Sequence, residues 1–149
     1  VELVTRETAG LFSGIRNIVE RTKSVKHAAL SNACGEYARR VVKVNKLDSI
    51  FEMSLGADDV SKAKPEPDGI RELCQKLNVD VSNACYVGDA PSDGRAAKAA
   101  GCMFSIGVNW GSHDLSDASN EEHFDIVCEA REELERFFMK ALTTNEVMP

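Results

Sequence analysis

The sequence lacks a long apolar run, an excess of positive charge and any paired-cysteine motif. No stretch approaches the roughly 20 apolar residues that a membrane-spanning helix needs, and no signal peptide opens the chain. The net charge of -6 argues against a nucleic-acid partner, because phosphate backbones are bound by clustered Lys and Arg. The 5 cysteines lack CxxC spacing, which disfavours zinc ligation and a disulfide framework and favours reduced thiols. We therefore expect a cytoplasmic protein with neither a membrane nor a nucleic-acid partner.

Length and composition are those of one globular domain. Apolar residues make up 43% and charged residues 28% of the 149 positions, a balance typical of chains that bury a core. Because there is no internal repeat, low-complexity tract or break in composition, we treat residues 1–149 as a single domain. Residues 1–10 are too short and mixed to assign and are interpreted as the remnant of a cap or linker. Residues 143–149 are predicted to form a disordered tail.

Apolar residues alternate between helical and strand spacing along the chain. Helical spacing predicts amphipathic helices at 14–23, 36–47, 70–77, 95–101 and 134–141. Short apolar runs predict strands at 27–30, 51–55, 84–87, 103–106 and 124–127. The stretch 107–117, rich in Gly, Asn, Ser and Asp, is predicted to be a loop. Strands separated by helices imply an α/β fold with a doubly wound, mostly parallel, Rossmann-like sheet flanked by helices.

The stretch ACYVGDAPSDGRAAKAAG at 84–101 carries two carboxylates at a strand end. Its apolar run meets Gly88, and Asp89 and Asp93 then bracket a turn that contains Pro91. Because ligands of open α/β sheets bind beyond the carboxyl ends of the strands, these two acids indicate a site for a hard cation. The alternative is that both residues only cap the following helix, as Asp commonly does. This stretch alone does not decide between the two interpretations.

Two further polar clusters occupy equivalent places in the pattern. Ser31 and Asn32 follow the predicted strand 27–30, and Lys64 lies in the proline-flanked turn KPEP before a helix. A hydroxyl, an amide, an ammonium and paired carboxylates at one sheet edge are what a metal-assisted phosphoryl site needs. Taken singly, Ser31 is better explained as a turn residue and Lys64 as a solvated surface charge. Their occurrence together and in this order favours the phosphate site.

In this order the clusters resemble the motifs of the haloacid dehalogenase-like hydrolases, in particular the phosphoglycolate phosphatase-like branch. ALSNACG at 29–35 resembles the second motif of that family, KPEP at 64–67 the third, and GDAPSD at 88–93 the fourth. GVNWG at 107–111 and LFSGI at 11–15 are also similar to the branch, where the latter marks re-entry from a cap domain. The resemblance covers roughly residues 11–137 and implies the family's fold.

The resemblance also implies a role for each matching residue. Ser31 and Asn32 would bind the substrate phosphate, and Lys64 would bridge the phosphate and the nucleophile, which makes Ser31 and Lys64 the implied catalytic residues. Asp89 would be a ligand of Mg²⁺, and Asp93 would support the metal shell. The implied activity is magnesium-dependent hydrolysis of a small phosphorylated metabolite such as phosphoglycolate. Dehalogenase or phosphomutase chemistry on the same scaffold is the runner-up.

One motif of the family is missing. The family's chemistry begins with an apolar strand that ends in DxD, whose first Asp attacks phosphorus, and residues 1–149 contain no such pattern. By resemblance, this segment would precede Val1 and would include the central strand, between the strands 27–30 and 84–87, together with the substrate-selecting cap.

Three explanations follow for this incomplete haloacid dehalogenase-like core. The chain is part of a longer phosphatase, or another chain or copy completes it by donating the missing strand and Asp. The third explanation is a noncatalytic binding or interaction module that has kept the fold but lacks the nucleophile.

Overall fold

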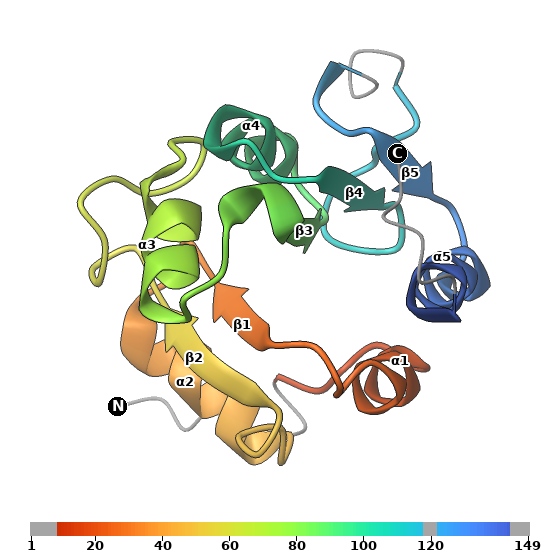
Figure 1. Ribbon diagram of the computed structural model, residues 1–149, viewed down its shortest axis with the longest axis horizontal. Coiled ribbons are helices and arrows are strands. Elements are labelled where there is room, and N and C mark those ends of the chain that lie inside the picture. The colour runs from red at the N-terminus through yellow and green to blue at the C-terminus, as the bar shows by residue number, and fades with distance from the viewer. Residues whose placement is uncertain (1–8, 118–121, 144–149) are drawn as a thin grey trace.

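The computed structural model describes residues 9–117 and 122–143, which form an alternating series of helices and strands (Figure 1). In chain order they are α1 (Ile15–Arg21), β1 (His27–Leu30), α2 (Gly35–Val44), β2 (Phe51–Leu55), α3 (Asp68–Lys76), a 3-10 turn η1 (Val81–Asn83), β3 (Cys85–Gly88), α4 (Pro91–Ala100), β4 (Phe104–Val108), β5 (Ile126–Cys128) and α5 (Arg131–Thr143). The α/β class and the order of elements predicted from the sequence are confirmed. Among the described residues, no helix is both long and apolar enough to cross a membrane.

Several boundaries differ from the sequence prediction. Helix α4 begins at Pro91 instead of 95, because proline suits the first turn of a helix, and this places Asp93 inside the helix. Strand β4 extends into the predicted loop because Gly107 and Val108 pair with β5. Thr143, predicted to lie in the tail, ends α5. Residues 1–8 and 144–149, which hold most of the predicted remnant and tail, lie outside the described residues.

The strands form two parallel sheets, one of two strands and one of three. Strand β1 pairs with β2, and β3, β4 and β5 pair in that order. Within residues 9–117 and 122–143, β1 has no partner besides β2, and β3 has none besides β4. The interruption lies between β1 and β3 (Figure 1), the two strands that the sequence analysis placed on either side of a missing central strand.

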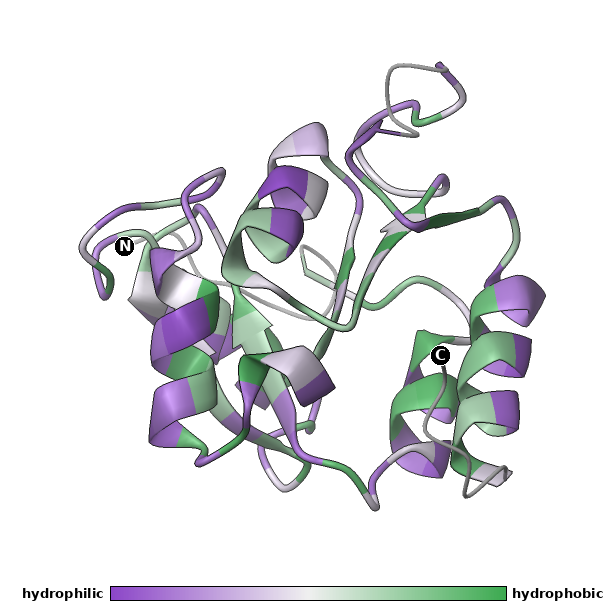
Figure 2. Ribbon diagram, turned by 45° about the horizontal axis from the view of Figure 1, so that its top comes forward, coloured by the Kyte–Doolittle hydropathy of each residue, from purple (hydrophilic) through white to green (hydrophobic). Residues whose placement is uncertain are grey.

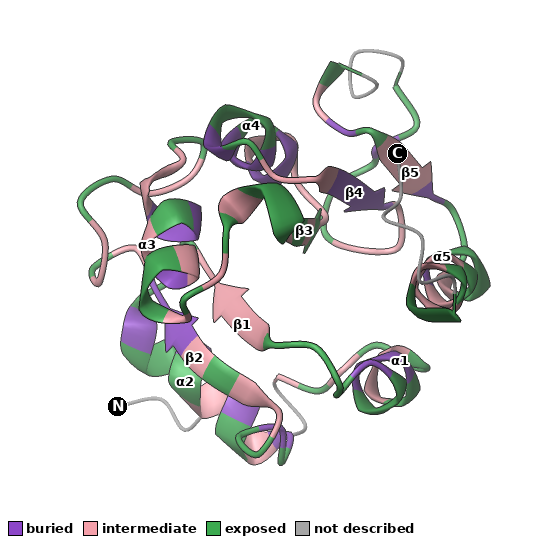
Figure 3. Cartoon of the chain, in the orientation of Figure 1, coloured by how far each residue is buried: buried purple, intermediate pink, exposed green. Residues whose placement is uncertain are grey.

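The strands beside the interruption are less buried than a strand inside the larger sheet. Strand β4 is buried along most of its length, as expected for a strand inside a parallel sheet. In contrast, β1 is half-buried throughout and β3 alternates between exposed and half-buried residues (Figure 3). Val87 of β3 remains 38% exposed although it is a large apolar residue. The strands that border the interruption are therefore less covered than the interior of the larger sheet.

Helices on both faces hold the two sheets together. On one face, α3 and α4 share an apolar cluster with Leu30 of β1 and Tyr86 of β3. On the opposite face, α1 joins two clusters, because Ile18 packs with residues of β4 and α5 while Val19 packs with residues of α2. Figure 2 shows the apolar side of α1 beside α5. This two-sided cover is the doubly wound arrangement, and it places the carboxyl ends of β1 and β3 near each other.

Candidate phosphate and metal site

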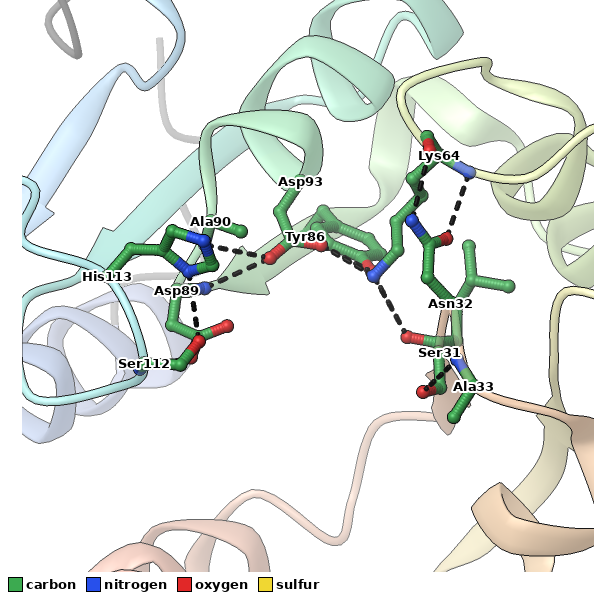
Figure 4. Close-up of polar contacts among 11 residues, drawn as sticks. Ser31, Asn32, Ala33, Lys64, Tyr86, Asp89, Ala90, Asp93, Ser112 and His113 are labelled. Atoms are coloured by element: carbon green, nitrogen blue, oxygen red, sulfur yellow. Dashed lines mark hydrogen bonds and ion pairs between the residues drawn. The ribbon is translucent and has the colours of Figure 1, made fainter.

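Lys64 lies in the loop before α3 and extends its ammonium group between the ends of β1 and β3 (Figure 4). Its Nζ donates hydrogen bonds to Asp93 Oδ1 at 2.6 Å, to the Tyr86 hydroxyl at 3.1 Å and to the Leu30 carbonyl at 3.3 Å. The Lys64 and Asp93 side chains are only 10% and 6% exposed, so this is a buried ion pair. A buried charge is tolerated when it is paired and hydrogen-bonded, and all three ammonium hydrogens have protein partners here.

Asp93 caps α4 as well as pairing with Lys64. Its Oδ2 accepts hydrogen bonds from the backbone amides of Asp89 at 3.1 Å and Ala90 at 3.0 Å, which are free donors at the start of the helix. Its Oδ1 accepts from Lys64 and, at 3.4 Å, from the Tyr86 hydroxyl. A carboxylate offers about four lone pairs, so the acceptor capacity of Asp93 is taken up within the protein. The capping interpretation therefore describes Asp93 well.

The close approach of Asp93 to β3 depends on Gly88. A Cβ added to Gly88 would lie 2.3 Å from Asp93 Cβ, far inside van der Waals contact. Only glycine lets the first turn of α4 lie this close to the end of β3. The glycine of the GDAPSD motif is thus explained by packing around the ion pair.

Asp89 is held by a loop distant in sequence. Its Oδ2 accepts hydrogen bonds from the Ser112 amide at 2.7 Å and the Ser112 hydroxyl at 2.8 Å, and that hydroxyl lies 2.9 Å from His113 Nδ1. Partial burial raises the pKa of Asp89, but the hydrogen bonds from Ser112 and the nearby His113 outweigh it, so the pKa lies below its ordinary value. Asp89 is therefore ionised at neutral pH.

Ser31 and Asn32 lie directly beyond β1. The Ser31 amide donates to the Leu55 carbonyl of β2 at 3.0 Å, and the Ser31 hydroxyl accepts from the Ala33 amide at 3.1 Å. The Asn32 side chain donates to the Lys64 carbonyl at 3.0 Å and accepts from the Lys64 amide at 3.1 Å. Asn32 thus clamps the backbone of Lys64, a positioning task that the sequence did not indicate.

Two adjacent aspartates tie the loop after β2 to α2. Asp58 accepts a hydrogen bond from the Gly35 amide at 2.6 Å, and Asp59 accepts from the Gly56 amide at 2.9 Å and from Arg39 at 2.8 Å. The bond from Gly56, followed by that from Arg39, lowers the pKa of Asp59 below its ordinary value. These contacts fix the loop after β2 against α2, whose first residue follows the loop that carries Ser31.

The donor set fits magnesium in part. Mg²⁺ prefers oxygen ligands and is usually held by one or two carboxylates together with water and phosphate oxygens. Asp89 fits this role, because its Oδ1 accepts no hydrogen bond from another described residue. Asp93 fits only as a support, since both of its oxygens are engaged. Within residues 9–117 and 122–143, no group of three or more His, Cys, Asp or Glu could hold a metal ion.

Sequence reasoning missed two residues of this site. The apolar run 84–87 predicts only a strand position for Tyr86, yet the Tyr86 hydroxyl accepts a hydrogen bond from Lys64 Nζ. Burial, and then the negative charge of Asp93, raise the pKa of Tyr86 well above its ordinary value. The only signal in the sequence was a phenol within a predicted apolar strand, since buried tyrosine hydroxyls usually find a hydrogen-bond partner. Ser112 gave no signal, because it lies 23 residues from Asp89.

The structure therefore brings Ser31, Asn32, Lys64, Asp89 and Asp93 to one edge of the fold, as the order of motifs suggested (Figure 4). A family profile described as haloacid dehalogenase-like hydrolase matches residues 2–107. The chain belongs to this family. The matched region contains all five of these residues, whereas Ser112 lies beyond its end.

Individual relatives agree with the family assignment. The chain is 36% identical over 95 residues to a phosphoglycolate phosphatase of Neisseria meningitidis, a match that covers 64% of the chain and 40% of that protein. It is 34% identical over 104 residues to the pyrophosphatase PpaX of Listeria welshimeri, which covers 70% of the chain and 46% of that protein. The chain thus spans less than half the length of these curated relatives.

Solved structures show the same fold. A crystal structure of a haloacid dehalogenase-superfamily hydrolase from Ehrlichia chaffeensis superimposes with a TM-score of 0.73 at 22% sequence identity. The match covers 87% of this chain and 58% of that one. At this identity the likeness establishes the fold alone, and it confirms the Rossmann-like architecture expected from the sequence.

Proposed function

We propose that the chain is the phosphate-binding, lysine-bearing part of a magnesium-dependent phosphatase of small phosphate monoesters, acting within a longer or completed enzyme. The observation that carries the proposal is the buried Lys64–Asp93 pair at the neighbouring ends of β1 and β3. An ammonium fixed there, beside Ser31 and the amides of its loop, suits a phosphate dianion. Relatives named phosphoglycolate phosphatase and pyrophosphatase support phosphatase chemistry.

Each residue has a separate task in this proposal. Lys64 neutralises phosphate charge by exchanging its longest contact, 3.3 Å to the Leu30 carbonyl, for a phosphate oxygen. Ser31 turns its hydroxyl from the Ala33 amide toward the phosphate, and Asn32 keeps the Lys64 backbone in place.

The acidic residues serve the metal. Asp89 offers its open Oδ1 to Mg²⁺, and Asp93 supports that ligand by holding the Asp89 amide. When bound, magnesium would neutralise and orient the phosphate.

The nucleophile in this proposal is an Asp supplied from outside residues 1–149. A strand carrying it would lie between β1 and β3, whose facing edges have no strand partner in the described part of the chain. Unpaired strand edges bind further strands readily, which supports an added segment at this place. A small phosphorylated metabolite as substrate and a cytoplasmic location remain predictions.

A chimera tests the proposal. Residues 1–149 would replace the matching region of the Neisseria meningitidis phosphoglycolate phosphatase, and hydrolysis of p-nitrophenyl phosphate with magnesium would be measured. We expect turnover that Lys64→Ala lowers by about 10²–10³-fold, since a charge clamp on the transition state is lost. Lys76→Ala is the control, because Lys76 lies at the end of α3 and pairs with Glu72 at the surface. A chimera that folds but shows no turnover would contradict the proposal.

A noncatalytic module is the alternative, favoured by two observations. Residues 1–149 contain no DxD pattern. The Lys64 ammonium group already donates to three acceptors within the protein, so it needs no ligand to satisfy its hydrogen bonds. If this alternative holds, the chimera should fold but show no turnover of p-nitrophenyl phosphate. Turnover that Asp89→Asn abolishes would rule this alternative out.

Completion in trans, where another chain or copy donates the missing strand, predicts oligomers because the strand edges beside the interruption are unpaired in the described part of the chain. Light scattering of chain 1–149 would detect them, and a stable monomer would contradict this version of the proposal.

A further inference from the structure

We infer that Ser112 is a positioning residue for Asp89, fixing Oδ2 so that Oδ1 is presented to a divalent cation. The inference rests on the proposed function, because it takes Asp89 as the metal ligand. It goes beyond that proposal because it assigns a task to the loop after β4. None of the sequence motifs gave a residue of this loop a role in the site. Figure 4 shows Ser112 beside the Asp89 carboxylate, on the side of Asp93 away from Lys64.

The Ser112–Asp89 contact differs from two similar contacts in the chain. Asp80 accepts from both the amide and the hydroxyl of Ser82, at 2.9 and 2.7 Å, and Asp114 accepts in the same way from Ser116, at 2.9 and 2.6 Å. Both are local turns between residues two apart, of the kind that Asp commonly forms. The bond pair from Ser112 instead spans 23 residues and joins the loop after β3 to the loop after β4.

Two donors on one oxygen restrict rotation of the Asp89 carboxylate. With Oδ2 held at 2.7 and 2.8 Å, the other oxygen has a defined direction. The backbone of the loop after β4 also lies directly against Asp89, because a Cβ added to Gly111 would lie 2.2 Å from Asp89 Cβ. Since Asp93 has no acceptor capacity left, Asp89 Oδ1 is the carboxylate oxygen of this motif that remains open to a cation.

The loss of a residue that orients a metal ligand has a typical effect on metal affinity. Removing a group that orients a metal ligand typically lowers metal affinity by about 10–100-fold. We therefore expect Ser112→Ala to weaken cation binding about tenfold or more, because the hydroxyl donor is lost while the amide remains. Ser112→Thr keeps the hydroxyl and should restore most of the affinity.

The test uses Mn²⁺ as the probe on chain 1–149. Paramagnetic broadening of the Asp89 and Ala90 amide signals detects even weak binding, and Asp89→Asn should abolish it. Affinities would be compared for the wild type, Ser112→Ala and Ser112→Thr, with Ser116→Ala as the matched control because it removes the same contact from Asp114. Thermal unfolding would establish that each variant is folded.

The outcomes separate the inference from the proposed function. The inference is supported if Ser112→Ala binds Mn²⁺ more weakly than the wild type, while Ser112→Thr and Ser116→Ala bind it about as tightly as the wild type. Equal affinity in the wild type and Ser112→Ala overturns it and leaves the metal role of Asp89 intact. A loss that threonine does not restore also overturns it, because packing of the loop would then be the cause. If the wild type shows no broadening that depends on Asp89, the metal role in the proposed function fails, and the inference fails with it.

Discussion

Lys64 Nζ lies 2.6 Å from Asp93 Oδ1, and this contact joins the loop before α3 to the first turn of α4. The two residues are 29 positions apart in the chain, and their side chains meet between strands of different sheets. The pair therefore holds together the two halves of the fold at the same edge where the candidate site lies. Stability and phosphate binding are thus expected to depend on the same residues.

Lys64→Met should destabilise the chain. The substitution keeps much of the side-chain volume but leaves the Asp93 carboxylate buried without its partner, which typically costs about 3–5 kcal/mol. Urea denaturation followed by circular dichroism measures this free energy of unfolding. Lys76→Met is the control, because the Lys76–Glu72 pair is solvent-exposed and such pairs contribute about 0–1 kcal/mol. Equal losses in the two variants would contradict a structural role for the buried pair.

Asn32→Ala should loosen Lys64 without removing its charge. The variant loses the two hydrogen bonds between the Asn32 amide and the Lys64 backbone, each with a net contribution of about 0.5–1.5 kcal/mol. We expect a moderate loss of stability in urea and altered amide signals in the loop that contains Lys64. Asn17→Ala, which loses a single surface contact to Glu135, is the comparison. Unchanged signals around Lys64 would show that the clamp is not formed in solution.

Gly88→Ala should destabilise the end of β3. Its Cβ would meet Asp93 Cβ at 2.3 Å, so the first turn of α4 must move and the ion pair must stretch. Overpacking of this kind typically costs about 1–3 kcal/mol. Gly101→Asn offers a control, since a Cβ there meets nothing within 4 Å and Asn tolerates the left-handed conformation of that residue. A Gly88→Ala variant as stable as the wild type would argue against this close approach.

Tyr86 should make the folded chain sensitive to alkaline pH. Its pKa is raised well above the ordinary value of about 10 by burial and by Asp93, so the folded state keeps the proton more tightly than the unfolded state. This contribution is fully present below pH about 10 and is lost as the pH rises through the pKa of the folded state. Urea denaturation between neutral and alkaline pH should therefore show a decline that Tyr86→Phe reduces. The same decline in Tyr86→Phe would be evidence against the raised pKa.

The order of elements and the place of each motif followed from local features of the sequence. Apolar spacing distinguished helices from strands, and polar residues after 27–30 and 84–87 located the site at strand ends, because side-chain periodicity depends on neighbours in the chain. The two tasks of Asp93 could not be separated in this way. Capping is a local contact with α4, whereas pairing with Lys64 depends on how two distant loops approach each other.

By itself, the sequence determined the fold class and the family and predicted five residues of the candidate site, because each of these is encoded in short motifs and in their order. Only the tertiary structure decided that Ser112 holds Asp89, that Asn32 clamps Lys64, and which strands pair with each other. The physical reason is that hydrogen bonds across distant loops and the pairing of strands depend on packing in space, which the spacing of residues along one chain does not specify.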